Sequence, residues 1–140
     1  MSNFTQKQID DVWEKGREIE GKDKDVYRLD AAGAIMKKDN RQANTQYGWE
    51  IDHIFPKKRL KDAGIPEDKW DDLVNLRPLQ ADNNRKKGDD YPHYTSEKRM
   101  NKDTFKNVTE EQSCDVHKSV RASIRKHYGL SEDVEGAQTK

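Results

Sequence analysis

WEIDHIFP, residues 49–56, is followed after a loop by NLRPLQADNNRKKG, residues 75–88, and these two stretches decide the expected fold. From Tyr47 to Ile54 the residues are aromatic, β-branched or charged, which predicts a strand. The proline that closes WEIDHIFP has no backbone N–H and would end that strand. Asp52 and His53 are therefore expected at a strand end.

The second stretch predicts another strand and then a helix. Leu76–Leu79 is expected to form a second short strand. Residues 82–87 end in three cations and are followed by Gly88, so we expect a helix with cations in its last turn and a glycine cap. In the loop between the stretches, Pro66 stands where a short helix at Glu67–Val74 would begin. The predicted order is strand, loop, strand and helix.

The N-terminal segment predicts a helix that supplies core side chains. Thr5 and Gln8 have the spacing of a capping box. The apolar residues that would continue one face of this helix are Ile9, Val12, Trp13 and Ile19. Further along, a short strand is expected at Ala34–Lys37, and the polar segment 37–46 is expected to be a loop.

The C-terminal third predicts a second long helix. It would open with Thr109 and Gln112 in capping-box spacing and stop at Gly129. Its apolar positions repeat every four residues and are Val116, Val120 and Ile124. Residues 130–140 are acidic and polar and are expected to form a flexible tail. The expected fold class is α+β, with one domain at residues 1–129 and a core at about residues 47–90.

Length and composition limit the kind of protein. A chain of 140 residues with 31% hydrophobic residues can bury one modest core, so Trp49, Phe55 and Trp70 are interpreted as core side chains rather than base-stacking groups. The single cysteine, Cys114, excludes an internal disulfide and a four-cysteine zinc site, so no structural zinc is expected. No apolar run is long enough for a signal peptide or a membrane span, so no membrane partner is expected and the cytoplasm is the default location.

The net charge is zero, so any case for a nucleic-acid partner depends on where the charges lie. The basic clusters are Lys57, Lys58, Arg59 and Lys61; Arg85, Lys86 and Lys87; and Lys118, Arg121, Arg125 and Lys126. Basic clusters are often only solvated faces. Two of these clusters flank the informative stretches, and we therefore interpret them as candidate phosphate contacts.

The residue types in these stretches suit hydrolysis of a phosphodiester bond. That reaction needs an activated water, a Lewis acid on the phosphate and cations that hold the substrate. His53 can accept a proton near neutral pH, because the unperturbed pKa of histidine is about 6.5. Asp52 and an asparagine of the predicted helix offer hard oxygen ligands that suit Mg²⁺ or Mn²⁺ better than zinc. Because neighbouring strand residues point to opposite faces, the strand must twist or end at Asp52 and His53.

Asp-His at a strand end, then Asn75, then Asn84 nine residues later resembles the HNH, or ββα-metal, nucleases. The pattern is most similar to the HNH domain of CRISPR RNA-guided nucleases. The resemblance covers about residues 26–88 and extends to small stand-alone bacterial HNH proteins. It implies a ββα-metal core, covered here by the N- and C-terminal helices, in a metal-dependent endonuclease that acts on DNA.

The resemblance also implies a role for each matched residue. His53 would be the general base, and Asn75 would fix the loop and orient the His53 ring. Asp52 and Asn84 would bind one divalent metal, Mg²⁺ in the first instance and Mn²⁺ as the alternative. The residues expected to contact phosphates of the nucleic acid are Arg85, Lys87, Lys57 and Lys58.

Several alternatives remain open at this level. Asn83 could exchange roles with Asn84, and only the interval from Asn75 favours Asn84. Ala32 stands where many relatives have cysteine, and Asn84 where many have histidine. The main alternative function is a non-catalytic nucleic-acid-binding subunit that retains the HNH fold, and a structural or interaction domain is a third. The sequence does not distinguish DNA from RNA, or a monomer from a symmetric homodimer.

Overall fold

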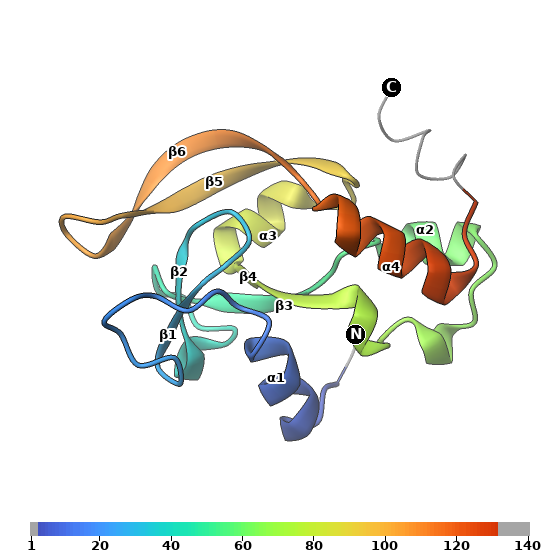
Figure 1. Ribbon diagram of the computed structural model, residues 1–140, viewed down its shortest axis with the longest axis horizontal. Coiled ribbons are helices and arrows are strands. Elements are labelled where there is room, and N and C mark those ends of the chain that lie inside the picture. The colour runs from blue at the N-terminus through green and yellow to red at the C-terminus, as the bar shows by residue number, and fades with distance from the viewer. Residues whose placement is uncertain (1–2, 132–140) are drawn as a thin grey trace.

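The computed structural model describes residues 3–131, and over that range the fold is mixed α+β with four helices and three two-stranded antiparallel sheets (Figure 1). The helices are α1 (Gln6–Trp13), α2 (Lys57–Asp62), α3 (Ala81–Lys87) and α4 (Lys118–Tyr128). The strands are β1 (Tyr27–Leu29), β2 (Ile35–Lys37), β3 (Trp49–His53), β4 (Leu76–Gln80), β5 (His93–Asn101) and β6 (Lys106–Asp115). Short 3-10 turns occur at η1 (Lys38–Asn40), η2 (Glu67–Lys69) and η3 (Leu73–Asn75). The predicted α+β class is confirmed.

The centre of the molecule is the pair β3–β4, followed directly by α3. The two strands are antiparallel, and their register runs from Trp49 opposite Gln80 to His53 opposite Leu76. Helix α3 ends at Gly88, whose φ of 53° lies in the left-handed region that glycine adopts without strain. The predicted order of strand, strand and helix is confirmed, and Asp52 and His53 do lie at the end of β3.

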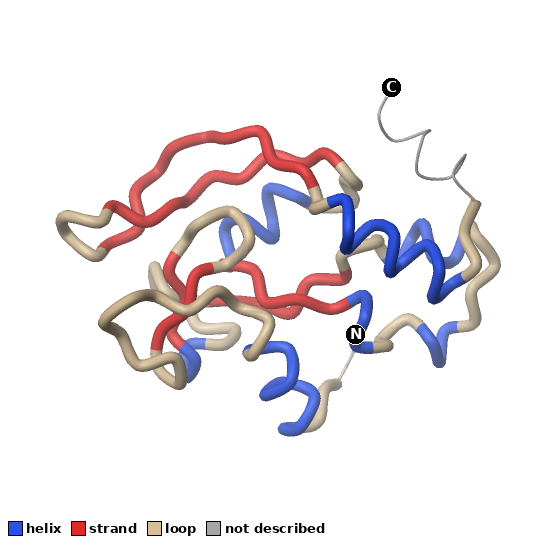
Figure 2. Tube along the Cα trace, viewed as in Figure 1, coloured by secondary structure: helices blue, strands red, loops and turns tan. Residues whose placement is uncertain are grey.

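Helix α3 lies between two sheets. Figures 1 and 2 show the β5–β6 ribbon above α3 and the β3–β4 pair below it, with α1 on the far side of β3–β4. The apolar side chains between α1 and β3–β4 include Val12, Trp13 and Trp49, which are almost completely buried. A second cluster forms under α4 and includes Phe55 and Ile124. The prediction that Trp49 and Phe55 are core residues is confirmed.

Helix α1 begins as predicted but ends earlier. The Thr5 hydroxyl accepts from the Gln8 N–H at 3.1 Å, and the Gln8 side chain accepts from the Thr5 N–H at 2.8 Å, so both halves of the capping box are present. The helix stops at Trp13, because the chain turns at Gly16 and pairs with β1. The expectation that Ile19 continues the apolar face of this helix is therefore wrong.

The largest error of the sequence-based prediction concerns the C-terminal third. Thr109 and Gln112 do not open a helix, because both lie in β6, which pairs with β5 in a long ribbon. Helix α4 begins only after His117, whose ring nitrogen accepts from the Ser119 N–H. Its predicted end at Gly129 is confirmed. The capping-box spacing at Thr109 was a coincidence, and the pairing partner that outweighs it lies more than ten residues upstream.

The segment between β3 and β4 is also more complex than predicted. Helix α2 was not foreseen, and the single helix expected at Glu67–Val74 is two 3-10 turns, with Pro66 just before the first. Leu130, which was assigned to a flexible tail, packs against the core under α4. Residues 132–140 of that predicted tail lie outside the described residues. Within residues 3–131, no helix is both long and apolar enough to cross a membrane.

Candidate active site

The adjacent residues Asp52 and His53 bond to different parts of the fold. The Asp52 carboxylate accepts from Arg77 Nε on β4 at 2.9 Å and faces the ammonium of Lys87 on α3 at 3.3 Å. His53 instead contacts the loop before β4, through Asp71. This is the alternation that a regular strand imposes on neighbouring side chains. β3 ends at His53 without giving the two side chains a shared partner, so the convergence of Asp52 and His53 on one metal and one water molecule stays a prediction.

Asp52, Arg77 and Lys87 form a buried cluster of three charges. Their side chains are 5%, 11% and 0% exposed, so water reaches the cluster only at its edge. Burial lowers the pKa of Lys87, with the Asp52 carboxylate opposing that shift and the Arg77 guanidinium adding to it. The phosphate contact predicted for Lys87 does not agree with this placement, because its ammonium is enclosed beside Asp52 and the His53 carbonyl.

His53 is half-buried, and one of its two ring nitrogens has a hydrogen-bond partner. Its Nε2 lies 2.6 Å from Asp71 Oδ1, and its side chain is 12% exposed. Burial lowers the pKa of His53 below its ordinary value, while the hydrogen bond to Asp71 raises it and the charge of Lys57 lowers it further. A histidine with a lowered pKa is mostly neutral at pH 7, and it can therefore accept a proton.

Asn75 holds the backbone that follows His53. Its side-chain oxygen accepts from the Phe55 N–H at 2.7 Å, and its side-chain nitrogen donates to the Phe55 carbonyl at 2.9 Å. Its own carbonyl accepts from the Ile54 N–H at 2.9 Å. Asn75 is fully buried. These bonds fix the backbone on the C-terminal side of His53, while the contact with the ring comes from Asp71.

The two neighbouring asparagines of α3 have different environments. The Asn83 amide bonds to Asp30 Oδ2 and the Lys98 carbonyl, and its oxygen accepts from the N–H groups of Glu97 and Lys98. Asn83 thus ties α3 to β5 and has its hydrogen bonds satisfied. Asn84 is half-buried and donates to Glu50 Oε1 at 2.8 Å. Within residues 3–131, no hydrogen bond reaches the Asn84 amide oxygen, so Asn84 is the asparagine with a ligand atom to spare.

The donor set around β3 fits Mg²⁺ in chemical type. It consists of the carboxylates of Glu50 and Asp52, which are two residues apart on one face of β3, and the free amide oxygen of Asn84. In the described part of the chain, no three His, Cys, Asp or Glu side chains are placed to hold a metal together. The divalent-metal site at Asp52 and Asn84 therefore stays a prediction.

The predicted phosphate contacts other than Lys87 lie at or near the surface. Lys57 opens α2 four residues after His53, and Lys58 beside it is exposed. The Arg85 side chain is 62% exposed and pairs with Glu50 at 3.4 Å and Asp82 at 3.3 Å. Exposed ion pairs of this kind contribute little to stability, so they hold the Arg85 guanidinium only weakly.

Three residues of this region were missed at the sequence level. They are Glu50, Asp71 and Arg77. The two-residue period of a strand could have placed Glu50 beside Asp52. For Asp71 the only signal is topological, because a loop that re-enters the sheet opposite His53 must bring the residues before Leu76 close to the ring. Arg77 could have been found only from the strand register, which places it directly opposite Asp52.

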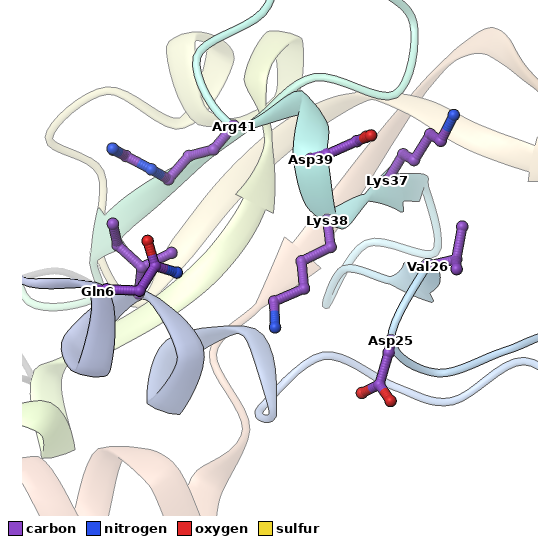
Figure 3. A pocket seen from close by; sticks show the side chains of 8 residues that line it. Gln6, Asp25, Val26, Lys37, Lys38, Asp39 and Arg41 are labelled. Carbon is purple, nitrogen blue, oxygen red and sulfur yellow. The ribbon is translucent and has the colours of Figure 1, made fainter.

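A separate hollow of about 390 Å³ lies between α1 and η1, on another part of the surface. Figure 3 shows Gln6 on α1 facing Lys38 and Arg41 across it. Lys38 is engaged with Asp10 at 3.2 Å. None of the predicted site residues lines this hollow, so it adds nothing to the chemistry at the end of β3.

Taken together, the end of β3 presents a neutral half-buried imidazole with one nitrogen held by a carboxylate, oxygen donors on the α3 side and cations nearby. Such an arrangement can remove a proton from a water molecule beside an anionic substrate. The sequence matches no protein-family profile, and neither the curated proteins nor the solved structures gave a match.

Proposed function

We propose that this chain is a metal-dependent endonuclease of the HNH type that hydrolyses phosphodiester bonds in DNA. The observation that carries the proposal is the setting of His53, whose ring is bonded to Asp71 and whose following backbone is pinned by Asn75. The order β3, β4 and α3, with Asn75 just before β4 and Asn84 in the helix, supports the same conclusion. It is the order expected of a ββα-metal centre.

Each group has a defined task in the proposed reaction. His53 takes a proton from the attacking water, and the neutral state of its imidazole at pH 7 suits that task. Asp52 and Asn84, with Glu50 beside them, would hold Mg²⁺ or Mn²⁺. The bound ion supplies Lewis-acid stabilisation of the phosphate charge. Arg85 and the first residues of α2, Lys57 and Lys58, hold the phosphates of the substrate strand.

A second candidate function is a non-catalytic nucleic-acid-binding subunit with the same fold. One observation favours it. Both oxygens of the Asp52 carboxylate face buried cations, Arg77 and Lys87, and a divalent ion would have to compete with them. In this function the basic side chains near β3 would still bind nucleic acid, but cutting would depend on another protein.

Cleavage of supercoiled plasmid separates the two functions. The purified protein is incubated with the plasmid in Mg²⁺, in Mn²⁺ and in EDTA, and the nicked and linear forms are resolved on an agarose gel. The nuclease proposal expects nicking that requires the metal. Binding of the plasmid without cutting in either metal would support the non-catalytic subunit. Neither binding nor cutting would overturn both.

Lys58 gives a prediction on DNA binding. Because Lys58 is exposed at the start of α2, Lys58→Ala should remove one phosphate contact and lower the slope of log Kd against log salt by about one. The measurement is a fluorescence-anisotropy titration at several salt concentrations in EDTA. Lys102→Ala is the matched control, since Lys102 is also exposed but lies in the turn at the far end of the β5–β6 ribbon (Figure 1). Equal slopes for the Lys58 and Lys102 variants would place the DNA elsewhere.

The environment of His53 gives a prediction on pH dependence. Burial lowers the pKa of His53 from its ordinary value of 6.5. The active form of a general base is the neutral one, so a lower pKa keeps His53 active to a lower pH. We therefore expect kcat/KM at saturating Mg²⁺ to be level above pH 6.5 and to fall only below it. The Lys58→Ala variant should show the same midpoint. A midpoint above 6.5 would contradict the assignment of His53 as the base.

A further inference from the structure

We propose that Asp71 is the positioning residue of His53: it holds the ring by Nε2 and thereby makes Nδ1 the nitrogen that accepts the proton from water. This inference rests on the proposed nuclease function. It adds a residue that no motif includes, since Asp71 lies in the connection between β3 and β4, four residues before Asn75.

The first step is the proton on the ring. The Nε2 atom of His53 lies 2.6 Å from Asp71 Oδ1. An ionised carboxylate can only accept hydrogen bonds, so the nitrogen that faces it carries the hydrogen. In neutral imidazole the other nitrogen then has the free lone pair. Among residues 3–131 no hydrogen bond reaches Nδ1 of His53, which leaves that lone pair available to a water molecule.

The second step is the rigidity of the loop that carries Asp71. On one side of Asp71, the Trp70 indole donates to the Ile65 carbonyl at 2.8 Å. On the other side, Asp72 bonds to His127 of α4 at 2.8 Å. The Tyr128 hydroxyl of α4 donates to the Lys69 carbonyl at 2.8 Å. Helix α4 therefore braces the loop that places Asp71 against the ring.

The third step is the location of the pair. The side chains of His53 and Asp71 are 12% and 34% exposed, so the pair lies at the edge of the solvent rather than in the core. A hydrogen bond between a neutral imidazole and a partly exposed carboxylate contributes only modestly to stability. A carboxylate that orients a ring at a site of proton transfer has a larger effect, because it fixes the tautomer and stabilises the imidazolium that forms. The geometry therefore points to a role in the reaction more than in folding.

The matched pair of variants is Asp71→Asn and Asp72→Asn. The two aspartates are neighbours with almost equal exposure, 34% and 35%, but Asp72 bonds to His127 and not to His53. We expect Asp71→Asn to lower kcat for plasmid nicking by about 100-fold with little change in KM. Asp72→Asn keeps a side-chain oxygen that can accept from His127, so the loop stays braced and kcat should stay within about threefold of the wild type. Asp71→Glu, which retains the carboxylate, should recover part of the lost rate.

The tautomer is read independently of activity. In ¹⁵N NMR spectra of the full chain without metal, the His53 ring signals are assigned from their absence in His53→Ala. The wild type should show a protonated Nε2 and an unprotonated Nδ1, and Asp71→Asn should increase the other tautomer. If the wild type does not cut DNA, the nuclease proposal fails, and the spectra alone decide the pairing. A wild-type ring protonated on Nδ1, or equal losses of kcat in Asp71→Asn and Asp72→Asn, would overturn the inference.

Discussion

Replacing His53 by alanine is expected to lower kcat for DNA cleavage by about 10³-fold, within the range by which a positioned general base accelerates a reaction. Burial lowers the pKa of His53, so its imidazole is mostly neutral at pH 7 and can accept a proton. No phosphate contact is assigned to the His53 ring. The Kd of the variant for DNA in EDTA should therefore stay within about twofold of the wild-type value. The measurement is plasmid nicking in Mg²⁺, with anisotropy for binding.

Two further variants make the His53 result decisive. His53→Gln keeps a side-chain amide that can donate to Asp71, so it tests the loss of the base with the hydrogen bond retained. His93 is an exposed histidine at the start of β5 that pairs with Asp115 at the end of β6. His93→Ala should leave kcat unchanged. Full cleavage by both His53 variants would exclude His53 as the base. A loss of the folded state, seen by circular dichroism, would move the test to His53→Gln alone.

The parts of the fold that could be predicted from the sequence are those with a local signal. The capping box at Thr5, the proline after β3 and the glycine after α3 each mark an element boundary through the chemistry of one or two residues. The β5–β6 ribbon has no such signal. Most of β6 is exposed or half-buried, so its pattern of apolar residues is weak, and the pairing with β5 depends on residues distant in the chain.

The candidate site divides in the same way. Asp52, His53, Asn75 and Asn84 could be selected from their spacing, and the structure sets them all on or beside β3, β4 and α3. Their partners could not be predicted, because Asp71 and Arg77 reach them only through the register of β3 against β4. Lys87 shows the limit most clearly. A lysine in a basic run is usually solvated, but the position of Lys87 in the last turn of α3 points its side chain inward, toward Asp52.

Asp52→Ala is expected to destabilise the protein strongly, by about 3–5 kcal/mol, which is the range for removing one partner from a buried charge cluster. The variant leaves the Arg77 guanidinium and the Lys87 ammonium close together, largely buried and without their anion. Urea unfolding followed by tryptophan fluorescence measures the change. Lys87→Met is the comparison. It replaces one cation with an uncharged side chain of similar length and leaves the Arg77 and Asp52 pair intact, so we expect the free energy of unfolding to change by no more than about 1 kcal/mol.

The double variant then separates a structural role of Asp52 from a role in metal binding. If Asp52 mainly neutralises buried cations, adding Lys87→Met to Asp52→Ala should recover part of the lost stability, because one of the two uncompensated charges is gone. A loss of nicking by Asp52→Ala alone therefore says little about metal binding. The informative comparison is a folded double variant: if its stability is restored but it still fails to bind Mn²⁺ in a spin-resonance titration, Asp52 serves as a metal ligand as well as a counter-ion. A cost below about 1 kcal/mol for Asp52→Ala would contradict the buried charge cluster itself.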